Sequence, residues 1–122
     1  METNRINLIE YRGNNSTMFT GRPQGEEVRK KLGFDMVDKN ENKIILEIPV
    51  GTTSFNPSFF LGLLFESISK LGVEKFEEKY EFDLSKVDSD FKEIIEDDIE
   101  DGMRHAKNSI KPNFGLESFF ND

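Results

Sequence analysis

The chain has 122 residues, enough for one domain with a single core. It has no cysteine, which excludes disulfides, a thiolate nucleophile and cysteine-based metal sites. Its formal net charge of −8 disfavours contact with nucleic-acid phosphates or anionic lipid, and no stretch is apolar enough for a signal peptide or a membrane span. We therefore expect a cytoplasmic protein without a cofactor, whose partners are other proteins.

The first third of the chain predicts a hairpin followed by a helix. RINLIEY alternates like a strand, residues 13–15 suit a turn, and STMFT at 16–20 would return as the second strand. A helix is then expected from Arg22 to Leu32, with Pro23 in its first turn and Gly33 at its end. Gly25 inside this helix costs about 1 kcal/mol relative to alanine, which a close approach of another backbone would explain.

The middle of the chain predicts the core. KIILEIPV at 43–50 is an almost continuous β-branched run, typical of a central strand covered on both faces. Asn56 and Pro57 are a strong helix start, as cap and first helical residue. Apolar residues cover most of the helix that follows, and Gly72 ends it.

The last third predicts one more strand and one more helix. VEKFEEKYEF at 73–82 suits a half-exposed strand, and from Asp88 or Ser89 the apolar residues return to helical spacing. The predicted order is β-β-α-β-α-β-α, an α/β fold with a mixed sheet and helices packed on it. We expect a domain over 1–108 and a phenylalanine-containing tail over 109–122, which could dock on the core, extend into a neighbouring chain or stay mobile.

Several blocks resemble a bacterial STAS-like domain family of unknown function, a distant relative of the anti-sigma factor antagonists. The blocks are TGRPQGEEVRKKL at 20–32, KIILEIPVGTTSFNPSFFLGLL at 43–64 and LGVEKFEEKYEF at 71–82. The matching positions are Arg22 and Gly25, Glu47 and Ile48, Ser58 and Phe59, and Gly72. The resemblance covers about residues 5–105 and implies a STAS-like sheet, regulation by protein–protein contact, and a kinase-like ATPase as the class of partner.

The loop at 51–59 is the first candidate site. Ser58 would lie in the first turn of a helix, where free N–H groups and the helix dipole stabilise an added phosphate. A serine at this position is also common simply because its hydroxyl satisfies those same donors. The candidate phosphoacceptor or partner-contact residues are Ser58, Asn56, Ser54, Thr53 and Phe59.

Arg22 and Gly25 are a second candidate, an anion or contact site at the start of the first helix. We prefer the simpler interpretation, in which Arg22 forms an ion pair with a nearby carboxylate such as Glu26. His105 is the only histidine, so a Ser-His-Asp arrangement would need it, and we expect it to face solvent.

The acidic run at 93–101 is the third candidate and carries six carboxylates with no basic residue. Because it lacks the glycine and the ligand spacing of an EF-hand loop, we predict a solvated helix face and no metal site. The alternative is a docking face for a basic partner, formed by Glu96, Asp97, Asp98 and Asp101.

Two functions follow from these features. The first is a non-enzymatic regulatory domain that acts by partner switching through residues 51–59. The alternative is an acidic inhibitor or docking protein, a charge mimic related to phage or defence, that uses the helix at 90–107. An enzyme is the weakest hypothesis, because the chain has one histidine and no metal or phosphate-loop motif.

Overall fold

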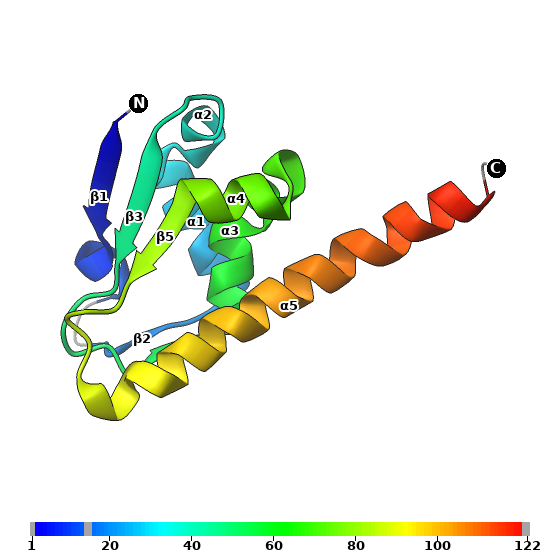
Figure 1. Ribbon diagram of the computed structural model, residues 1–122. Helices are drawn as coiled ribbons and strands as arrows, with labels where there is room; N and C mark the ends of the chain where they lie inside the picture. The colour runs from blue at the N-terminus through cyan, green and yellow to red at the C-terminus, as the bar shows by residue number, and fades with distance from the viewer. Residues whose placement is uncertain (1, 14–15, 121–122) are drawn as a thin grey trace.

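The computed structural model describes residues 2–13 and 16–120, with side chains described as far as Ile110. The N-terminal part contains β1 (Thr3–Asn7), the short 3-10 helix η1 (Leu8–Tyr11), β2 (Met18–Phe19), α1 (Arg22–Leu32) and α2 (Phe34–Val37). The rest contains β3 (Lys43–Glu47), β4 (Ser54–Phe55), α3 (Pro57–Leu71), α4 (Val73–Lys79), β5 (Tyr80–Asp83) and α5 (Ser89–Phe120). Figure 1 shows β1, β3 and β5 to one side of α3 and α4, with β2 below α3 and α5 running out from the body.

The main sheet has the order β1-β3-β5, and both of its strand pairs are parallel. Each connection between these strands contains helices, which is how parallel neighbours are joined. β2 and β4 form a second, two-stranded parallel ladder. The chain is therefore an α/β fold, as predicted, but its described ladders are parallel where a mixed sheet was expected.

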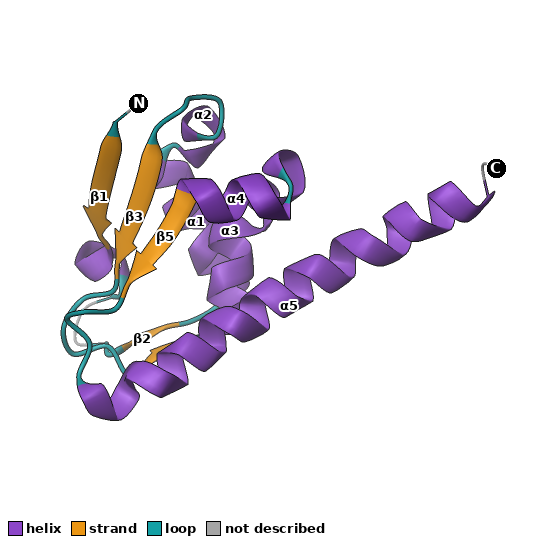
Figure 2. Cartoon of the chain, viewed as in Figure 1, coloured by secondary structure: helices purple, strands orange, loops and turns teal. Residues whose placement is uncertain are grey.

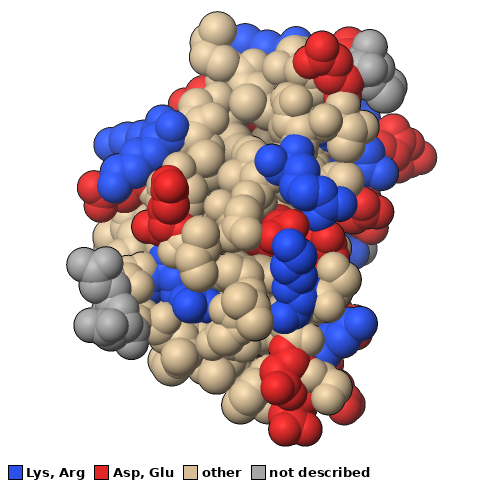
Figure 3. Space-filling view, turned by 90° about the vertical axis from the view of Figure 1, so that its left-hand side faces the viewer, with Lys and Arg blue, Asp and Glu red and all other residues tan. Residues whose placement is uncertain are grey.

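Helices cover one face of the main sheet (Figure 2). Ile44, Leu46 and Tyr80 point to this face and are buried. On the other face, Arg5 and Glu81 are exposed and Ile45 is half-buried. The expectation that the 43–50 strand is covered on both faces was therefore wrong, because the helices that pack on the main sheet lie on one face of it. Seen from the side of β1, charged side chains of both signs are interspersed with uncharged ones (Figure 3).

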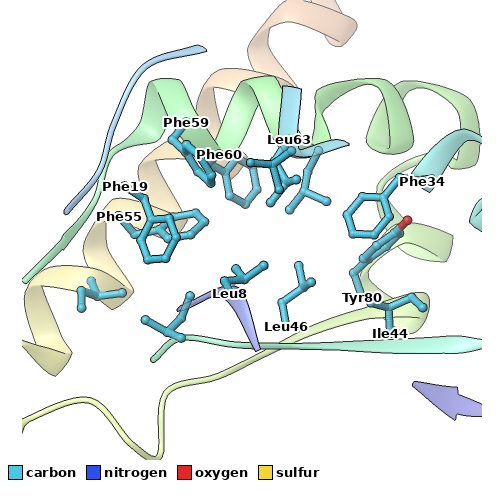
Figure 4. Close-up of a cluster of buried hydrophobic side chains, with 14 of the residues drawn as sticks. Leu8, Phe19, Phe34, Ile44, Leu46, Phe55, Phe59, Phe60, Leu63 and Tyr80 are labelled. Atoms are coloured by element: carbon cyan, nitrogen blue, oxygen red, sulfur yellow. The ribbon is translucent and has the colours of Figure 1, made fainter. Parts of the chain in front are cut away.

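The core is built largely from aromatic side chains. Phe55 and Phe59 meet edge to face with ring centroids 5.3 Å apart, and Phe19 lies 5.2 Å from each of them. At the other end of the core, Phe34 packs against Tyr80 (Figure 4). Such contacts favour one arrangement of the rings, so they specify the core as well as stabilise it.

The predicted hairpin at the N-terminus was wrong. β2, from the expected return strand 16–20, pairs in parallel with β4 and not with β1. Asn14 and Asn15 of the expected turn lie outside the described residues. Local alternation predicted two strands here but carried no information about their partners.

The predicted strand at 73–82 was wrong over most of its length. Residues Val73–Lys79 form α4, and β5 takes only Tyr80–Asp83. Glutamate and lysine are good helix formers, and Phe76 and Tyr80 lie one helical turn apart on the buried side. Gly72, with φ of +83°, separates α4 from α3.

The predicted helices at 22–32 and 57–71 are confirmed with these bounds, and a helix begins at Ser89 as expected. The boundary predicted between 108 and 109 falls inside α5, whose backbone is helical to Phe120. The side chains of Phe114, Leu116, Phe119 and Phe120 lie outside the described residues. Within the described residues, no helix combines the length and the apolar character needed to cross a bilayer.

Candidate functional site

The fold brings the first two candidate sites together. β2 and β4 run parallel, with Phe19 opposite Phe55, and each strand leads within a few residues into a long helix. The backbone N–H of Asn56 donates to the carbonyl of Phe19 at 2.9 Å. As a result, α1 and α3 begin side by side, although their first residues are 35 positions apart, at Arg22 and Pro57.

Two glycines allow α1 and α3 to touch backbone to backbone. A Cβ atom at Gly25 would lie 2.3 Å from the carbonyl oxygen of Phe59, and one at Gly62 would lie 2.1 Å from that of Arg22. No side chain fits at these distances. Gly25 thus serves the close approach that its position in a helix suggested, and packing accounts for it without a bound anion.

The first turn of α3 leaves the Ser58 hydroxyl free. The Asn56 side chain caps the helix by accepting from the backbone N–H of Ser58 at 2.8 Å, and Pro57 occupies the first turn. Ser58 is exposed, and its hydroxyl forms no hydrogen bond with the described residues. The cap is therefore supplied by Asn56, and capping does not explain Ser58.

The other candidate hydroxyls in the loop are engaged. Thr53 pairs with Thr17, their Oγ1 atoms 2.9 Å apart. The Ser54 hydroxyl donates to the Asp98 carboxylate at 3.3 Å. Buried Thr52 donates to the carbonyl of Pro49 at 2.8 Å. Among the hydroxyls between 52 and 58, only that of Ser58 is both exposed and without a partner in the described part of the chain.

Phe59, next to Ser58 in the first turn of α3, belongs to the core. Its side chain is 1% exposed and packs against Phe19 and Phe55, so it contributes to the core and not to the surface. This packing holds the first turn of α3 against the β2–β4 ladder. Partner contact at this end of α3 therefore depends on Ser58 and its exposed neighbours.

Arg22 is exposed at the start of α1, and its guanidinium carbon lies 5.6 Å from the centroid of the Phe65 ring. This is a cation–π contact between α1 and α3. The expected Arg22–Glu26 ion pair is not present among the described residues. The guanidinium therefore lies along α3 at Phe65, about two helical turns beyond Ser58.

The acidic run does not form one uniform face. Glu96 and Asp97 are exposed, whereas Asp101 is paired with Arg104 at 2.5 Å. Asp98 turns inward and accepts from the backbone N–H of Phe55 at 3.1 Å. This carboxylate ties α5 to β4, so the acidic helix and the loop at 51–59 are joined structurally. His105 is exposed, as expected.

A polar cluster that sequence reasoning missed lies at the carboxyl edge of the main sheet. Asn7, Glu47 and Asp83 end β1, β3 and β5 in one register row. Glu47 is 5% exposed and accepts from Asn7 at 2.7 Å, and Arg5 bridges Glu47 and Asp83. Hydrogen bonds from Ser85, followed by that from Arg5, lower the pKa of Asp83 to about 2.

Ligands of open α/β sheets usually bind beyond this edge. Here, however, the charged groups satisfy one another, because Lys86 also lies 3.5 Å from Glu47. The cluster is therefore an ion-pair network across three strands. The sequence does place a polar residue at the end of each of these three strands. That pattern points to a cluster only when the order of the strands in the sheet is known.

A second missed cluster is buried around Arg29, which is 5% exposed. Its guanidinium donates to Ser67 at 2.7 Å and to the carboxylates of Asp35 and Asp38 at 2.9 and 3.0 Å. The Tyr80 hydroxyl donates to Asp38, and burial, followed by this hydrogen bond, raises the Tyr80 pKa. The cluster ties α1, α3 and β5 together at the end of α3 opposite Ser58.

The described residues contain no group of three or more His, Asp or Glu side chains placed to hold a metal ion. Searches of protein-family models, curated proteins and solved structures find no match to this chain. The resemblance to STAS-like domains consequently remains a prediction from the sequence.

Proposed function

We propose that the chain is a non-enzymatic regulatory domain that binds a protein partner through the paired starts of α1 and α3. The observation that carries this proposal is the free hydroxyl of exposed Ser58, in a turn whose cap is already supplied by Asn56. The Ser58 side chain is therefore accessible to a partner, and covering it breaks no hydrogen bond within the described fold.

The geometry also suits a switch. A phosphate on Ser58 would lie within the first turn of α3, where free N–H groups and the helix dipole favour negative charge. Arg22, at the start of the neighbouring helix, adds an exposed basic residue to the same pair of helices, with its guanidinium over Phe65. Modification would therefore change the charge of the contact surface without disturbing the core beneath it.

The resemblance to anti-sigma factor antagonists supports a kinase-like ATPase as the partner class to test first. Partner switching would then consist of binding to this ATPase when Ser58 is unmodified and release when the serine carries a phosphate. This part of the proposal rests on the sequence blocks around Arg22 and Ser58.

The test compares two serines on the same helix. The full chain is used to capture partners from extracts of its source organism, as wild type, Ser58→Glu and Ser69→Glu. Ser69 is exposed near the other end of α3 and is the matched control. We expect a defined partner with wild type and Ser69→Glu that is lost with Ser58→Glu. Equal recovery by all three would reject the surface.

Mass spectrometry of protein isolated from the same cells tests the switch separately. Phosphate on Ser58, and not on Thr52, Thr53 or Ser54, is expected because those three hydroxyls are engaged within the fold. If the capture experiment succeeds but Ser58 is never phosphorylated, the binding surface is supported and regulation by phosphorylation is rejected.

The acidic-inhibitor alternative receives less support. Of its four named carboxylates, Asp98 is bound to β4 and Asp101 is paired with Arg104. Neutralising all four would therefore also disturb the loop that carries Ser54. The variant that separates the two functions is Glu96→Gln with Asp97→Asn, because both of these side chains are exposed.

A further inference from the structure

A groove lies between α4, β5 and α5, and the residues that line it do not include Ser58. Its volume is about 490 Å³. The apolar and aromatic part of its lining comes from four elements and consists of Phe60, Phe76, Tyr80, Phe82, Ile99 and Met103. The first three of these side chains belong to the buried core, and the other three are half-buried. The groove is therefore an apolar depression beside the last strand of the main sheet.

This strand, β5, lies at an edge of the sheet, because the strand order is β1-β3-β5. Figure 1 shows it as the strand of this sheet farthest from β1. The backbone of Asp83 faces β3, since its carbonyl accepts from the N–H of Ile48 at 3.0 Å. In a parallel ladder, successive residues of a strand direct their N–H and C=O groups to opposite sides. The N–H and C=O of Phe82 therefore point away from β3, and an edge strand presents such groups to a further strand.

The edge of β5 and the groove form one surface, and Phe82 belongs to both. Its backbone lies at the edge, while its side chain lines the groove with that of Tyr80, on the sheet face shared with Ile44 and Leu46. Residues that lie opposite each other in neighbouring strands point to the same face. A strand added beside β5 would therefore direct every second side chain into the groove. In strand addition, main-chain hydrogen bonds give affinity and pockets for alternate side chains give specificity.

The other side chains of an added strand would lie on the open face of the sheet, where β5 carries Glu81 and Asp83. Asp83 is held by Arg5. Glu81 is exposed and lies 3.8 Å from Lys43 on the side of β3, so its other side faces the position of the added strand. Together with the net charge of −8, these carboxylates favour basic residues in the occupant.

A second copy of the chain does not suit this edge. If two β5 strands paired antiparallel about Phe82, Glu81 of each copy would lie opposite Asp83 of the other, and like charges directly opposite destabilise a strand pair. Basic residues at these positions replace the repulsion with attraction. The charged residues of the groove itself are balanced, since Glu77 and Glu100 accompany two basic residues, so the side chains that enter the groove should be apolar.

We propose that the edge of β5 binds an extended segment of a protein partner in which apolar residues alternate with lysine or arginine. The segment adds a fourth strand to the main sheet. Its backbone pairs with Phe82, its apolar side chains fill the groove, and its basic side chains lie beside Glu81. This surface is separate from the one around Ser58, and neither requires the other.

A synthetic peptide tests the proposal on the full chain. The probe has seven residues and blocked ends, and its lysines alternate with phenylalanine and valine. We expect it to slow hydrogen exchange of the Phe82 amide, measured by NMR, because this N–H then donates to the peptide. A matched peptide with a methyl group on every backbone nitrogen keeps the side chains but loses its donors. Fluorescence anisotropy should give a dissociation constant about tenfold or more higher for this peptide.

Protein variants test the two faces of the added strand. Glu81→Lys should raise the dissociation constant of the probe about fivefold. Glu74→Lys makes the same change in net charge at an exposed position of α4 outside the groove, and should raise it less than about twofold. Met103→Asp puts a charge into the groove wall and should weaken binding about tenfold or more. Circular dichroism of each variant checks that the fold is retained.

The other outcomes overturn the proposal. Equal binding of the methylated peptide, or unchanged exchange of the Phe82 amide, would mean that the groove takes up side chains without strand addition. Equal losses in Glu81→Lys and Glu74→Lys would mean general charge attraction without a site. Protection of Phe82 that rises with protein concentration in the absence of peptide would assign the edge to a second copy. A probe that does not bind at all would reject the site.

Discussion

Two serines on α3 have opposite surroundings. Ser67, near the end of the helix, is fully buried and hydrogen-bonded to both Arg29 and Asp38. Ser58, in the first turn, is exposed and has no hydroxyl partner among the described residues. Between them, Gly62 holds α3 against the backbone of α1. One end of the helix is thus fixed to the fold through a polar network, and the other end is presented to solvent.

This difference shows how the same residue type can serve stability or contact. A buried polar side chain must be satisfied within the fold, because leaving it unpaired is costly. An exposed hydroxyl is satisfied by water and can exchange that water for a partner. The fixed end keeps α3 from moving, which makes the open end a rigid surface. Substitutions should therefore cost most at the fixed end of α3 and least at the open end.

The largest effect is expected at Arg29. Arg29→Met removes the cation that faces Asp38, whose side chain is 3% exposed, and leaves a buried carboxylate without its ion pair. Loss of one member of a buried pair costs about 3–5 kcal/mol in the free energy of unfolding. Urea denaturation would measure this loss.

The same variant offers a second readout. Hydrogen bonds from Arg29, followed by Lys70, lower the pKa of Asp35, so in Arg29→Met this pKa should rise towards its ordinary value. Lys30→Met, at an exposed position of the same helix, is the control and should change stability by less than about 0.5 kcal/mol. If both variants were equally stable, the buried cluster would not be what fixes this end of α3.

A smaller loss is expected at the crossing of the helices. Gly62→Ala places a methyl group 2.1 Å from the Arg22 carbonyl oxygen, so α1 and α3 must separate. Overpacking of this kind costs about 1–3 kcal/mol. At an uncrowded position inside a helix, replacing glycine by alanine would stabilise the protein by roughly 0.5–1 kcal/mol. The sign of the change in the free energy of unfolding therefore shows whether the two helices touch. A stabilised variant in thermal unfolding would show that the helices do not touch here.

The cap at the open end should matter less. Asn56→Ala removes the acceptor for the Ser58 N–H and should cost about 1 kcal/mol. Asn56→Asp retains an acceptor and is expected to restore most of this stability. If alanine and aspartate behaved alike, another group would be capping α3.

The smallest effect is expected at Ser58 itself. Ser58→Ala should change the free energy of unfolding by less than about 0.5 kcal/mol, because the hydroxyl has no partner in the described fold. Ser67→Ala is the matched comparison and should cost more, because it leaves Arg29 and Asp38 each without one hydrogen bond. Similar losses at both serines would remove the distinction between the two ends of the helix.

Much of the candidate site was readable in the sequence. Asn56 and Pro57 predicted the start of α3, and they do so because capping and a fixed proline φ act within a few residues. Gly25 suggested a close backbone contact, which Phe59 and Leu63 provide. What could not be read was which hydroxyl stays free, because that depends on Asp98 and Thr17 approaching from distant parts of the chain.

Two of the errors in the fold have related causes. In VEKFEEK, apolar residues separated by charged ones fitted both a half-exposed strand and a helix, and packing of Phe76 and Tyr80 on the core decided for the helix. At STMFT the extended backbone was predicted correctly near Met18 and Phe19, but its partner was not. Strand pairing is a long-range contact, and alternation within one segment says nothing about it.

The sequence by itself determined where α1 and α3 begin and end, and that the chain has no cysteine chemistry, because these follow from local backbone preferences and composition. Only the tertiary structure decided that β2 pairs with β4, that Arg29 is buried against Asp38, and that Arg22 and Ser58 lie at neighbouring helix starts. Those features join residues 30 or more positions apart, or depend on burial that other segments create. They are also the features that separate the fixed end of α3 from the open end proposed to bind a partner.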